Sequence, residues 1–256
     1  MTSRFDADWL VPEWNAPGIG AVMTTRRGGV SAGPFESLNL RDGLGDDAAA
    51  VRENQRRLEQ AIGAAPVWLK QVHGDVVVPL ASTSASAGAS PPVGDASMTT
   101  EPGVVCAVQT ADCLPVLFAA PGARGVAAAH AGWRGLAGGV LEASIGALCK
   151  AAHCEPGELQ AWLGACIGPR SFEVGADVLE AFGADPQGRS PAFEALKPGK
   201  WHADLPSLAR DRLRAAGVQA ISGGGWCTVE SPSRFFSFRR DGVTGRMAAA
   251  VWIERR

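Results

Sequence analysis

Three apolar runs in the middle of the chain place the strongest constraint on its fold. The runs are VVCAVQT, LPVLFAA and RGVAAAH, which cover residues 104–110, 114–120 and 124–130 and are separated by short turns. Their apolar residues do not alternate strictly with polar ones, a pattern typical of strands that are covered on both faces. The sequence therefore predicts mixed sheets with helices packed outside them.

The rest of the chain predicts further helices and strands. Residues 47–62 show the pattern of an amphipathic helix, with Asp46 or Asp47 as its N-cap. A second helix, capped by Asp204, is expected to run to Gly217. The remaining predicted elements are helices at 136–151 and near 174–183, strands at 19–25 and 161–167, an extended hairpin over 66–80 that carries His73, an irregular stretch up to 203, and strands in VQAISGG, RFFSFRR and RMAAAVWI.

Length and composition favour one globular domain over residues 1–256. The chain has 256 residues, of which 46% are hydrophobic, so it is long enough to bury a large core. Its formal net charge of -2 gives no electrostatic reason to expect a nucleic-acid partner. Small anionic or polar ligands fit this charge better.

The N-terminus and the cysteines favour a cytoplasmic location. The segment MTSRFDADWLVPEW carries acids and a proline where a secretory signal would have a basic start followed by an apolar run. No stretch approaches the roughly 18 apolar residues of a membrane span. We therefore expect the six cysteines to be reduced thiols.

Cys113, His130 and His73 each stand at the end of an apolar stretch. Cys113 follows Asp112 in a turn between predicted strands, His130 ends a strand, and His73 lies beside Gly74. Taken singly, they read as a buried thiol, a hydrogen-bonded core histidine and an exposed hairpin residue. Taken together, two imidazoles and a thiolate suit Zn²⁺ and leave a fourth position for water, whose pKa zinc can lower to about 7. The set predicts an open metal site, which would also bind copper strongly.

Charged residues near these positions can bind or orient a ligand. Arg134 lies in HAGWRG at the start of a predicted helix, and Arg170 follows the Gly-Pro turn of GACIGPR. Both suit phosphate or sugar hydroxyls, and both are also explained as surface cations. Asp112 and Asp95 are candidates for orienting a ligand histidine or moving a proton, or they serve as turn and cap residues.

A series of motifs runs in a fixed order along the chain: TTRRGGVS, SLNL, GDD, QVHG, TADCLPVLF, AAHAGWRGL, IGPRSFEVG, FFSFRRD and TGRMA. They resemble the motifs of the bacterial YfiH family, also called the laccase-domain or peptidoglycan-editing-factor family. The resemblance extends from about residue 19 to residue 253. It implies an α+β fold, a four-layer α/β/β/α sandwich with mixed sheets, and a zinc site at His73, Cys113 and His130.

The resemblance also implies an activity. Members of the family are regarded as purine nucleoside enzymes, which convert adenosine to inosine and cleave adenosine, inosine, guanosine or methylthioadenosine with phosphate. Older descriptions make them copper polyphenol oxidases. Bacterial members are also linked to removing wrongly incorporated residues from peptidoglycan precursors.

The number and type of possible metal ligands in the chain favour some of these activities over others. A four-copper oxidase uses many imidazole ligands, whereas this chain has four histidines in all. Deamination fits a zinc site, with Asp112 as the candidate proton shuttle.

In the YfiH-like motif FFSFRRD, Phe238 stands where relatives often have tyrosine, and the chain contains no tyrosine. For contacts to phosphate and nucleoside the candidates are Arg26, Asn39, Asp95, Arg134, Arg170 and Arg239.

Two other classes of function stay open. A metal-free hydrolase would use Cys113 as its nucleophile and His130 or His73 as the base, and it could edit peptidoglycan precursors. Such an enzyme predicts activity that survives chelation. A zinc-stabilised binding protein would retain metal without turnover.

Overall fold

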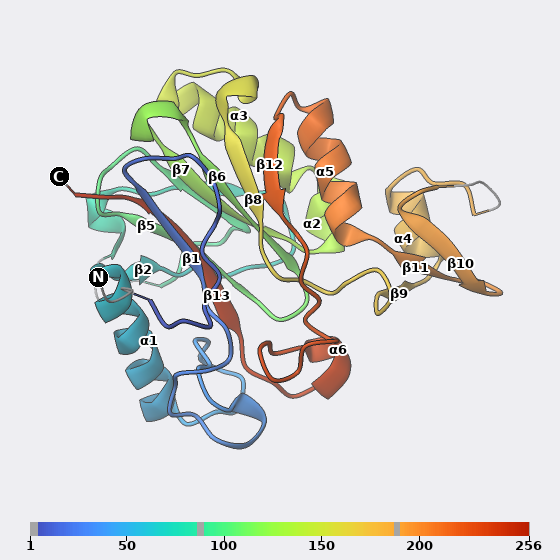
Figure 1. Cartoon of the computed structure of the whole chain (residues 1–256), viewed down its shortest axis with the longest axis horizontal. Helices are drawn as coiled ribbons and strands as arrows, with labels where there is room; N and C mark the ends of the chain where they lie inside the picture. Colours follow the sequence, from blue (N-terminus) through green and yellow to red (C-terminus); the bar gives the residue numbers. More distant parts are fainter. Residues whose placement is uncertain (1–4, 86–89, 187–189, 256) are drawn as a thin grey trace.

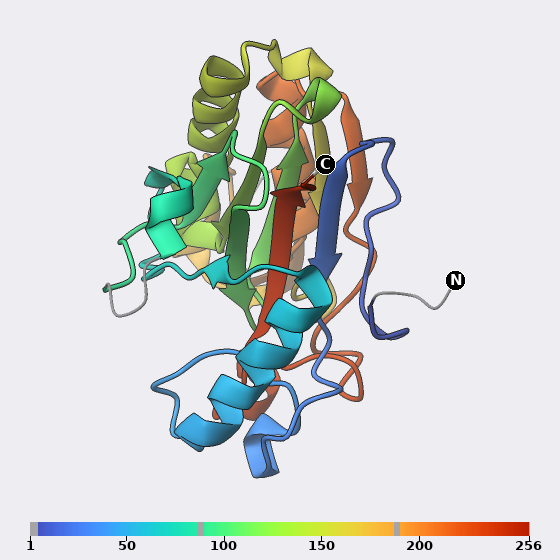
Figure 2. The same cartoon turned by 90° about the vertical axis from the view of Figure 1, so that its left-hand side faces the viewer.

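Two mixed sheets lie face to face at the centre of the computed structural model, which describes residues 5–85, 90–186 and 190–255 (Figures 1 and 2). The four-stranded sheet has the order β1 (Ile19–Met23), β13 (Met247–Ile253), β5 (Val105–Thr110) and β2 (Pro66–Val67). The six-stranded sheet has the order β12 (Ala220–Gly223), β8 (Gln160–Leu163), β6 (Leu114–Ala119), β7 (Val126–Ala131), β4 (Ala96–Thr99) and β3 (Val77–Pro79). Each sheet contains both parallel and antiparallel pairs.

Helices cover the outer face of each sheet. The helix α1 (Ala48–Ile62) packs on the four-stranded sheet, while α2 (Trp133–Gly138), α3 (Val140–Ala152) and α5 (Leu205–Ala215) pack on the six-stranded sheet (Figure 1). The predicted four-layer sandwich is therefore confirmed. The remaining elements are α4 (Ala176–Ala181), α6 (Phe238–Asp241), a small sheet of β9 (Glu173–Val174), β11 (Lys200–Ala203) and β10 (Phe193–Lys197), and 3-10 helices at Gly33–Phe35, Ser82–Ala85, Pro121–Ala123 and Pro156–Glu158.

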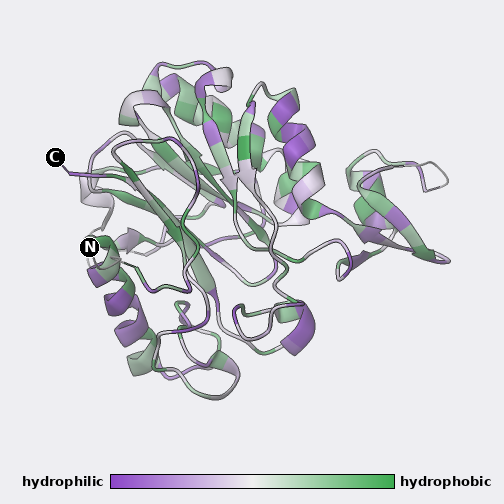
Figure 3. Cartoon of the chain, viewed as in Figure 1, coloured by the Kyte–Doolittle hydropathy of each residue, from purple (hydrophilic) through white to green (hydrophobic). Residues whose placement is uncertain are grey.

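Apolar side chains fill all three spaces between these four layers. In β5, Cys106 and Val108 face the other sheet, whereas Val105 and Ala107 face α1. Both faces are buried, which explains why the run has no polar alternation. Figure 3 shows hydrophobic residues concentrated on the central strands, with hydrophilic residues on α1 and α5. The apolar runs therefore form the middle of the sandwich, as predicted.

The first helix begins and ends as its sequence predicts. The side chain of Asp47 accepts the backbone N–H of Ala49 at the N-terminus. At the other end Gly63 adopts a left-handed conformation with a φ of 87°, which glycine tolerates without strain. Among the described residues, no helix is both long enough and apolar enough to cross a membrane.

Two predicted elements are divided differently in the structure. The segment 66–80 is not a hairpin, because β2 pairs with β5 in one sheet and β3 pairs with β4 in the other. The chain crosses between the sheets there, and His73 lies in the crossing. The single helix predicted at 136–151 is two helices, because Gly139 breaks it with a φ of 101°.

The prediction of a strand over RFFSFRR is wrong. The backbone N–H of Phe235 donates to the carbonyl of Ser231, and that of Phe236 donates to the sulfur of Met247. The first bond closes a turn and the second ends on a side chain, so neither belongs to a strand ladder, and α6 follows. Conversely, the stretch before 203 contains the β10–β11 hairpin. The sequence does not indicate this hairpin, because β10 lacks the apolar pattern of a covered strand, and in the structure four of its five residues are exposed.

Candidate metal centre

His73, in the crossing between β2 and β3, comes together with Cys113 just before β6 and His130 near the end of β7. Their ligand atoms all lie within 4.8 Å of one another. The Sγ of Cys113 is 3.7 Å from Nε2 of His73, and the centroids of the two imidazole rings are 4.9 Å apart. Within residues 5–85, 90–186 and 190–255, this is the one group of three or more potential ligands with such spacing.

The geometry and chemistry of this group fit a metal ion. A tetrahedral zinc ion with bonds of about 2.0–2.3 Å separates its ligand atoms by about 3.3–3.8 Å, a range that includes the 3.7 Å between Cys113 and His73. Gly132 provides the room, since a Cβ there would lie 2.9 Å from Cys113 Sγ and 3.0 Å from His73 Cδ2. Two imidazoles and a thiolate suit zinc, and they also bind copper.

One buried carboxylate, that of Asp95, holds both histidines. Its Oδ1 lies 2.9 Å from Nδ1 of His130. The backbone N–H groups of Val72, His73 and Gly74 donate to its oxygens at 3.0, 2.9 and 2.7 Å. These bonds stabilise the positive φ of 62° at His73, which is uncommon for a residue with a side chain. With Nδ1 engaged, His130 presents Nε2 to the centre.

Cys113 and His130 shift each other's pKa. Burial alone would raise the pKa of the Cys113 thiol, but the charge of His130 and hydrogen bonds from His130 and His73 outweigh it and lower that pKa to about 6. Burial opposes the charge on His130, yet the thiolate and Asp95 raise its pKa to about 9. Without metal, these shifts favour a thiolate beside an imidazolium at neutral pH. The thiolate is the form that binds metals and attacks electrophiles.

A cavity of about 320 Å³ opens beside this centre. Two arginines on its wall lie against aromatic rings: Cζ of Arg134 is 4.4 Å from the ring centroid of Trp133, and Cζ of Arg239 is 5.4 Å from that of Phe172. A concave site with aromatic surfaces and cations suits a ligand that has a flat ring and an anionic group. The cavity is lined by His73, Ala111, Asp112, Cys113, Gly132, Trp133, Arg134, Ile167, Phe172, Leu205, Phe238 and Arg239.

Asp112 connects the Cys113 turn to α6. Its Oδ1 accepts the hydroxyl of Thr228 at 2.6 Å, and its Oδ2 accepts the backbone N–H of Arg239 at 2.6 Å. Both oxygens are thus engaged in positioning the wall of the cavity. The role of Asp112 as a proton shuttle stays a prediction.

Four of the six predicted contact residues do not line this cavity. Arg26 donates to two backbone carbonyls, and Asn39 is buried and bonded within the loop 39–46. Arg170 pairs with Glu230 and lines a different hollow. Asp95 lies behind the histidines rather than on the cavity wall. Of the predicted set, the structure brings Arg134 and Arg239 to the cavity.

Sequence reasoning missed the apolar part of the wall. Ile167, Phe172 and Leu205 come from separate segments, and the fold alone brings them together. Their sequence contexts resemble those of ordinary core residues, so no local pattern singles them out. Phe238 could have been selected from the sequence, because it lies in FFSFRRD, one of the motifs on which the family resemblance rests.

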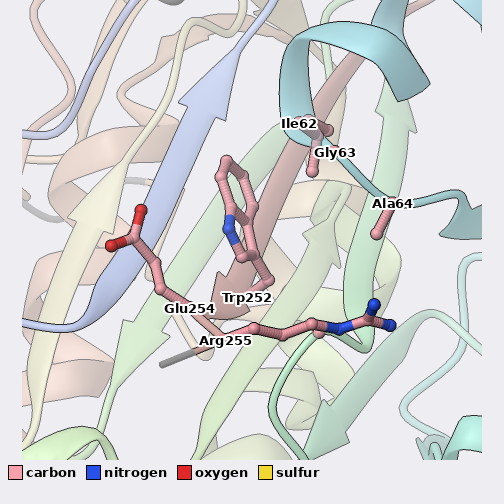
Figure 4. A pocket seen from close by; sticks show the side chains of 7 residues that line it. Ile62, Gly63, Ala64, Trp252, Glu254 and Arg255 are labelled. Atoms are coloured by element: carbon pink, nitrogen blue, oxygen red, sulfur yellow. The ribbon is translucent and has the colours of Figure 1, made fainter.

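A second hollow, of about 260 Å³, lies at the other end of β5. Gly103 lines it just before that strand begins, whereas Cys113 follows the end of the strand. Figure 4 shows the indole of Trp252 there, with Glu254 and Arg255 nearby. Its described lining contains no histidine or cysteine, so the metal-binding chemistry belongs to the first cavity.

Comparisons with known proteins agree with the motifs. Residues 20–254 match a family model described as multi-copper polyphenol oxidoreductase laccase. A Pseudomonas aeruginosa purine nucleoside phosphorylase is 50% identical over 96% of this chain and 98% of its own, and Escherichia coli purine nucleoside phosphorylase YfiH is 47% identical over 95% and 98%. The crystal structure of Neisseria meningitidis protein NMB0706 matches with a TM-score of 0.89 and 45% identity, covering 97% of this chain and 100% of that one. The chain therefore belongs to the YfiH-containing family of multi-copper polyphenol oxidoreductase laccase proteins.

Proposed function

We propose that this chain is a purine nucleoside phosphorylase, which uses phosphate to cleave the bond between a purine and its ribose. The observation that carries the proposal is one cavity that joins a His-Cys-His centre, two arginines and aromatic side chains. Relatives that are 47% and 50% identical over nearly the whole chain bear that name.

Arg134 and Arg239 are the residues that would bind phosphate. Each guanidinium is held against an aromatic ring, so it loses little conformational freedom when an oxyanion binds. The planar guanidinium group also suits the geometry of phosphate. In the reaction a phosphate oxygen forms a bond to C1′ of the ribose as the bond to the base nitrogen breaks. The base leaves with the electron pair and takes up the proton that the phosphate loses, and the other product is ribose 1-phosphate.

His73, Cys113 and His130 would hold a zinc ion. When bound, zinc supplies a Lewis acid with an open coordination position. A centre of several copper ions would lack ligands in the described part of the chain. His153 caps the end of α3 and His202 lies in β11, and both are outside the His-Cys-His group. A single copper ion is compatible with the same three ligands.

Deamination of adenosine is the second candidate activity. The open ligand set beside Asp112 favours it, because zinc deaminases pair a metal with a carboxylate that moves protons. However, both oxygens of Asp112 already accept hydrogen bonds that position the cavity wall, from Thr228 and from the Arg239 amide. The proposed phosphorolysis assigns no proton transfer to Asp112, and for methylthioadenosine it would use the same residues.

The alternative is a hydrolase that acts on peptidoglycan precursors. A Cys113 thiolate with a pKa of about 6, beside His130, has the properties of a cysteine nucleophile. The same thiolate serves as a metal ligand in the main proposal. The two mechanisms therefore differ in whether activity needs the metal.

Product analysis tests the main proposal. Wild-type protein loaded with zinc should convert inosine to hypoxanthine and ribose 1-phosphate only when phosphate is present. Cys113→Ala should abolish this conversion, whereas Cys154→Ala is the matched control, because Cys154 is a partly buried thiol outside the centre. Inosine formed from adenosine would establish deamination. No product from zinc-loaded wild type would rule out the phosphorylase.

A further inference from the structure

Phe238 is unusually exposed for an aromatic residue. Its exposed fraction is 57%, and every other described phenylalanine and tryptophan is less exposed. A phenylalanine contributes to stability mainly through burial, and the side chain of Phe238 is mostly exposed. It lines the cavity beside His73 and Cys113 instead. This placement indicates a role in binding rather than in packing.

The backbone around Phe238 is fixed relative to the metal centre. Ser237 caps α6, and Phe238 is the first residue of that helix. The next residue, Arg239, donates its backbone N–H to Asp112 at 2.6 Å. Asp112 is adjacent to Cys113 in the sequence. One hydrogen bond therefore ties the position of this ring to that of a metal ligand.

The surroundings of the ring leave surface available for a ligand. The guanidinium Cζ of Arg246 lies 5.8 Å from the ring centroid, and it is held by hydrogen bonds to the carbonyls of Thr244 and Gly245. More than half of the side chain nevertheless remains open. An aromatic ring with a cation nearby and open surface favours stacking with another flat ring.

The other two aromatic rings of the cavity offer less surface. Phe172 is 7% exposed, and Arg239 lies over its ring. Trp133 is partly buried, and Arg134 lies over it at 4.4 Å. These two rings hold the arginines in place, whereas Phe238 is available for the ligand.

We propose that Phe238 stacks on the base of the nucleoside and holds it in the cavity. This inference rests on the proposed phosphorylase function. A phenyl ring has no hydrogen-bonding group, so the contact selects a flat aromatic surface without reading the edge of the base. It therefore holds 6-amino and 6-oxo purines equally well, and it holds the smaller pyrimidines more weakly.

Kinetics of Phe238→Leu, which removes the ring, test this assignment. With phosphate saturating, we expect KM for inosine and guanosine to rise about 10-fold, since stacking on one base contributes about 1–3 kcal/mol. The kcat and the KM for phosphate should stay within about 2-fold, because the ring does not touch the reacting bond. Phe238→Tyr should restore the nucleoside KM. Val243→Ala is the control, because Val243 is 59% exposed and does not line the cavity.

Three outcomes would overturn the stacking assignment. One is a wild-type nucleoside KM in Phe238→Leu. Another is a loss confined to kcat, and the third is loss of bound zinc, which would show a structural role. Calorimetric titration with inosine separates this inference from the phosphorylase proposal. If wild type binds inosine without turnover and Phe238→Leu binds it about 10-fold more weakly, stacking stands while the proposed reaction fails.

Discussion

The carboxylate of Asp95 lies 2.9 Å from Nδ1 of His130, and it also accepts the backbone N–H of His73. One residue therefore positions two imidazoles from distant parts of the chain. Asp95 is itself fixed by the sheet, because it immediately precedes β4, and the backbone N–H of His130 in β7 donates to its carbonyl at 2.7 Å. The pairing of β4 with β7 thus determines the geometry of the centre.

Asp95→Asn should weaken zinc binding about 10–100-fold, a range typical for loss of a partner that orients a ligand histidine. The amide keeps the shape of the carboxylate but loses its charge and one acceptor. Zinc affinity is measured by competition with a chromogenic chelator. Asp47→Asn is the matched control, because asparagine caps α1 as well as aspartate does. Wild-type zinc affinity in Asp95→Asn would contradict the role of this residue.

Gly132→Ala should disrupt the centre through contact alone. The backbone at Gly132 has a φ of -62° and a ψ of 159°, which alanine adopts freely. The added Cβ would nevertheless lie 2.9 Å from Cys113 Sγ. We expect bound zinc and activity to fall at least about 10-fold, since a metal site tolerates ligand shifts of only a few tenths of an ångström.

Gly138→Ala is the control for that substitution. Gly138 is the last residue of α2, and a Cβ there meets nothing within 4 Å. Zinc content should be unchanged, and the free energy of unfolding should rise by up to about 1 kcal/mol, because alanine favours the helix. Both variants are compared by zinc content and thermal unfolding. Equal zinc content in the two variants would contradict a close fit at Gly132.

Some of this site follows from the sequence and some depends on the fold. Cys113 immediately precedes β6 and His130 lies near the end of β7, so both are at the open end of this hairpin of apolar strands, where the register Leu114↔Ala131 places them side by side. Such a pairing is predictable from the strand pattern. His73 joins them only because the chain crosses between sheets and Asp95 fixes the crossing. Local periodicity contains no information about that crossing.

Which arginine side chains reach the cavity also depends on the fold. Arg26 and Arg134 both lie in glycine-containing motifs, and both were candidates for binding phosphate. The fold turns Arg26 toward backbone carbonyls and Arg134 toward the cavity. A long flexible side chain reaches many positions from one backbone site, so loop packing decides its partner.

In the metal-free protein, alkylation of Cys113 by iodoacetamide should have a midpoint near pH 6, because the pKa of that thiol is lowered to about 6. The rate should rise with pH through this midpoint and then level off, since the thiolate is the reacting form. His130→Gln removes the main stabilising charge, and burial then raises the midpoint. Peptide mapping identifies the alkylated residue. A midpoint above pH 8 in wild type would contradict the coupling between Cys113 and His130.

Arg134→Ala and Arg239→Ala should each raise KM for phosphate about 10-fold or more, with a smaller change in KM for inosine. A charge-assisted hydrogen bond of about 1.5–3 kcal/mol is lost in each case. Arg170→Ala should leave both constants unchanged, because Arg170 pairs with Glu230 and lines a different hollow. The constants come from initial rates at varied phosphate. Equal increases in both KM values would remove the assignment of these arginines to phosphate.

Removal of the metal separates the phosphorylase from the cysteine hydrolase. Dialysis against dipicolinate should abolish phosphorolysis in proportion to the zinc removed, and added zinc should restore it, because the three ligands serve one ion. A hydrolase that uses the Cys113 thiolate predicts the opposite, since chelation frees its nucleophile. Zinc content and product formation are therefore followed in the same samples. Cys113→Ala is inactive under both mechanisms, so the response of wild-type protein to chelation is the observation that distinguishes them.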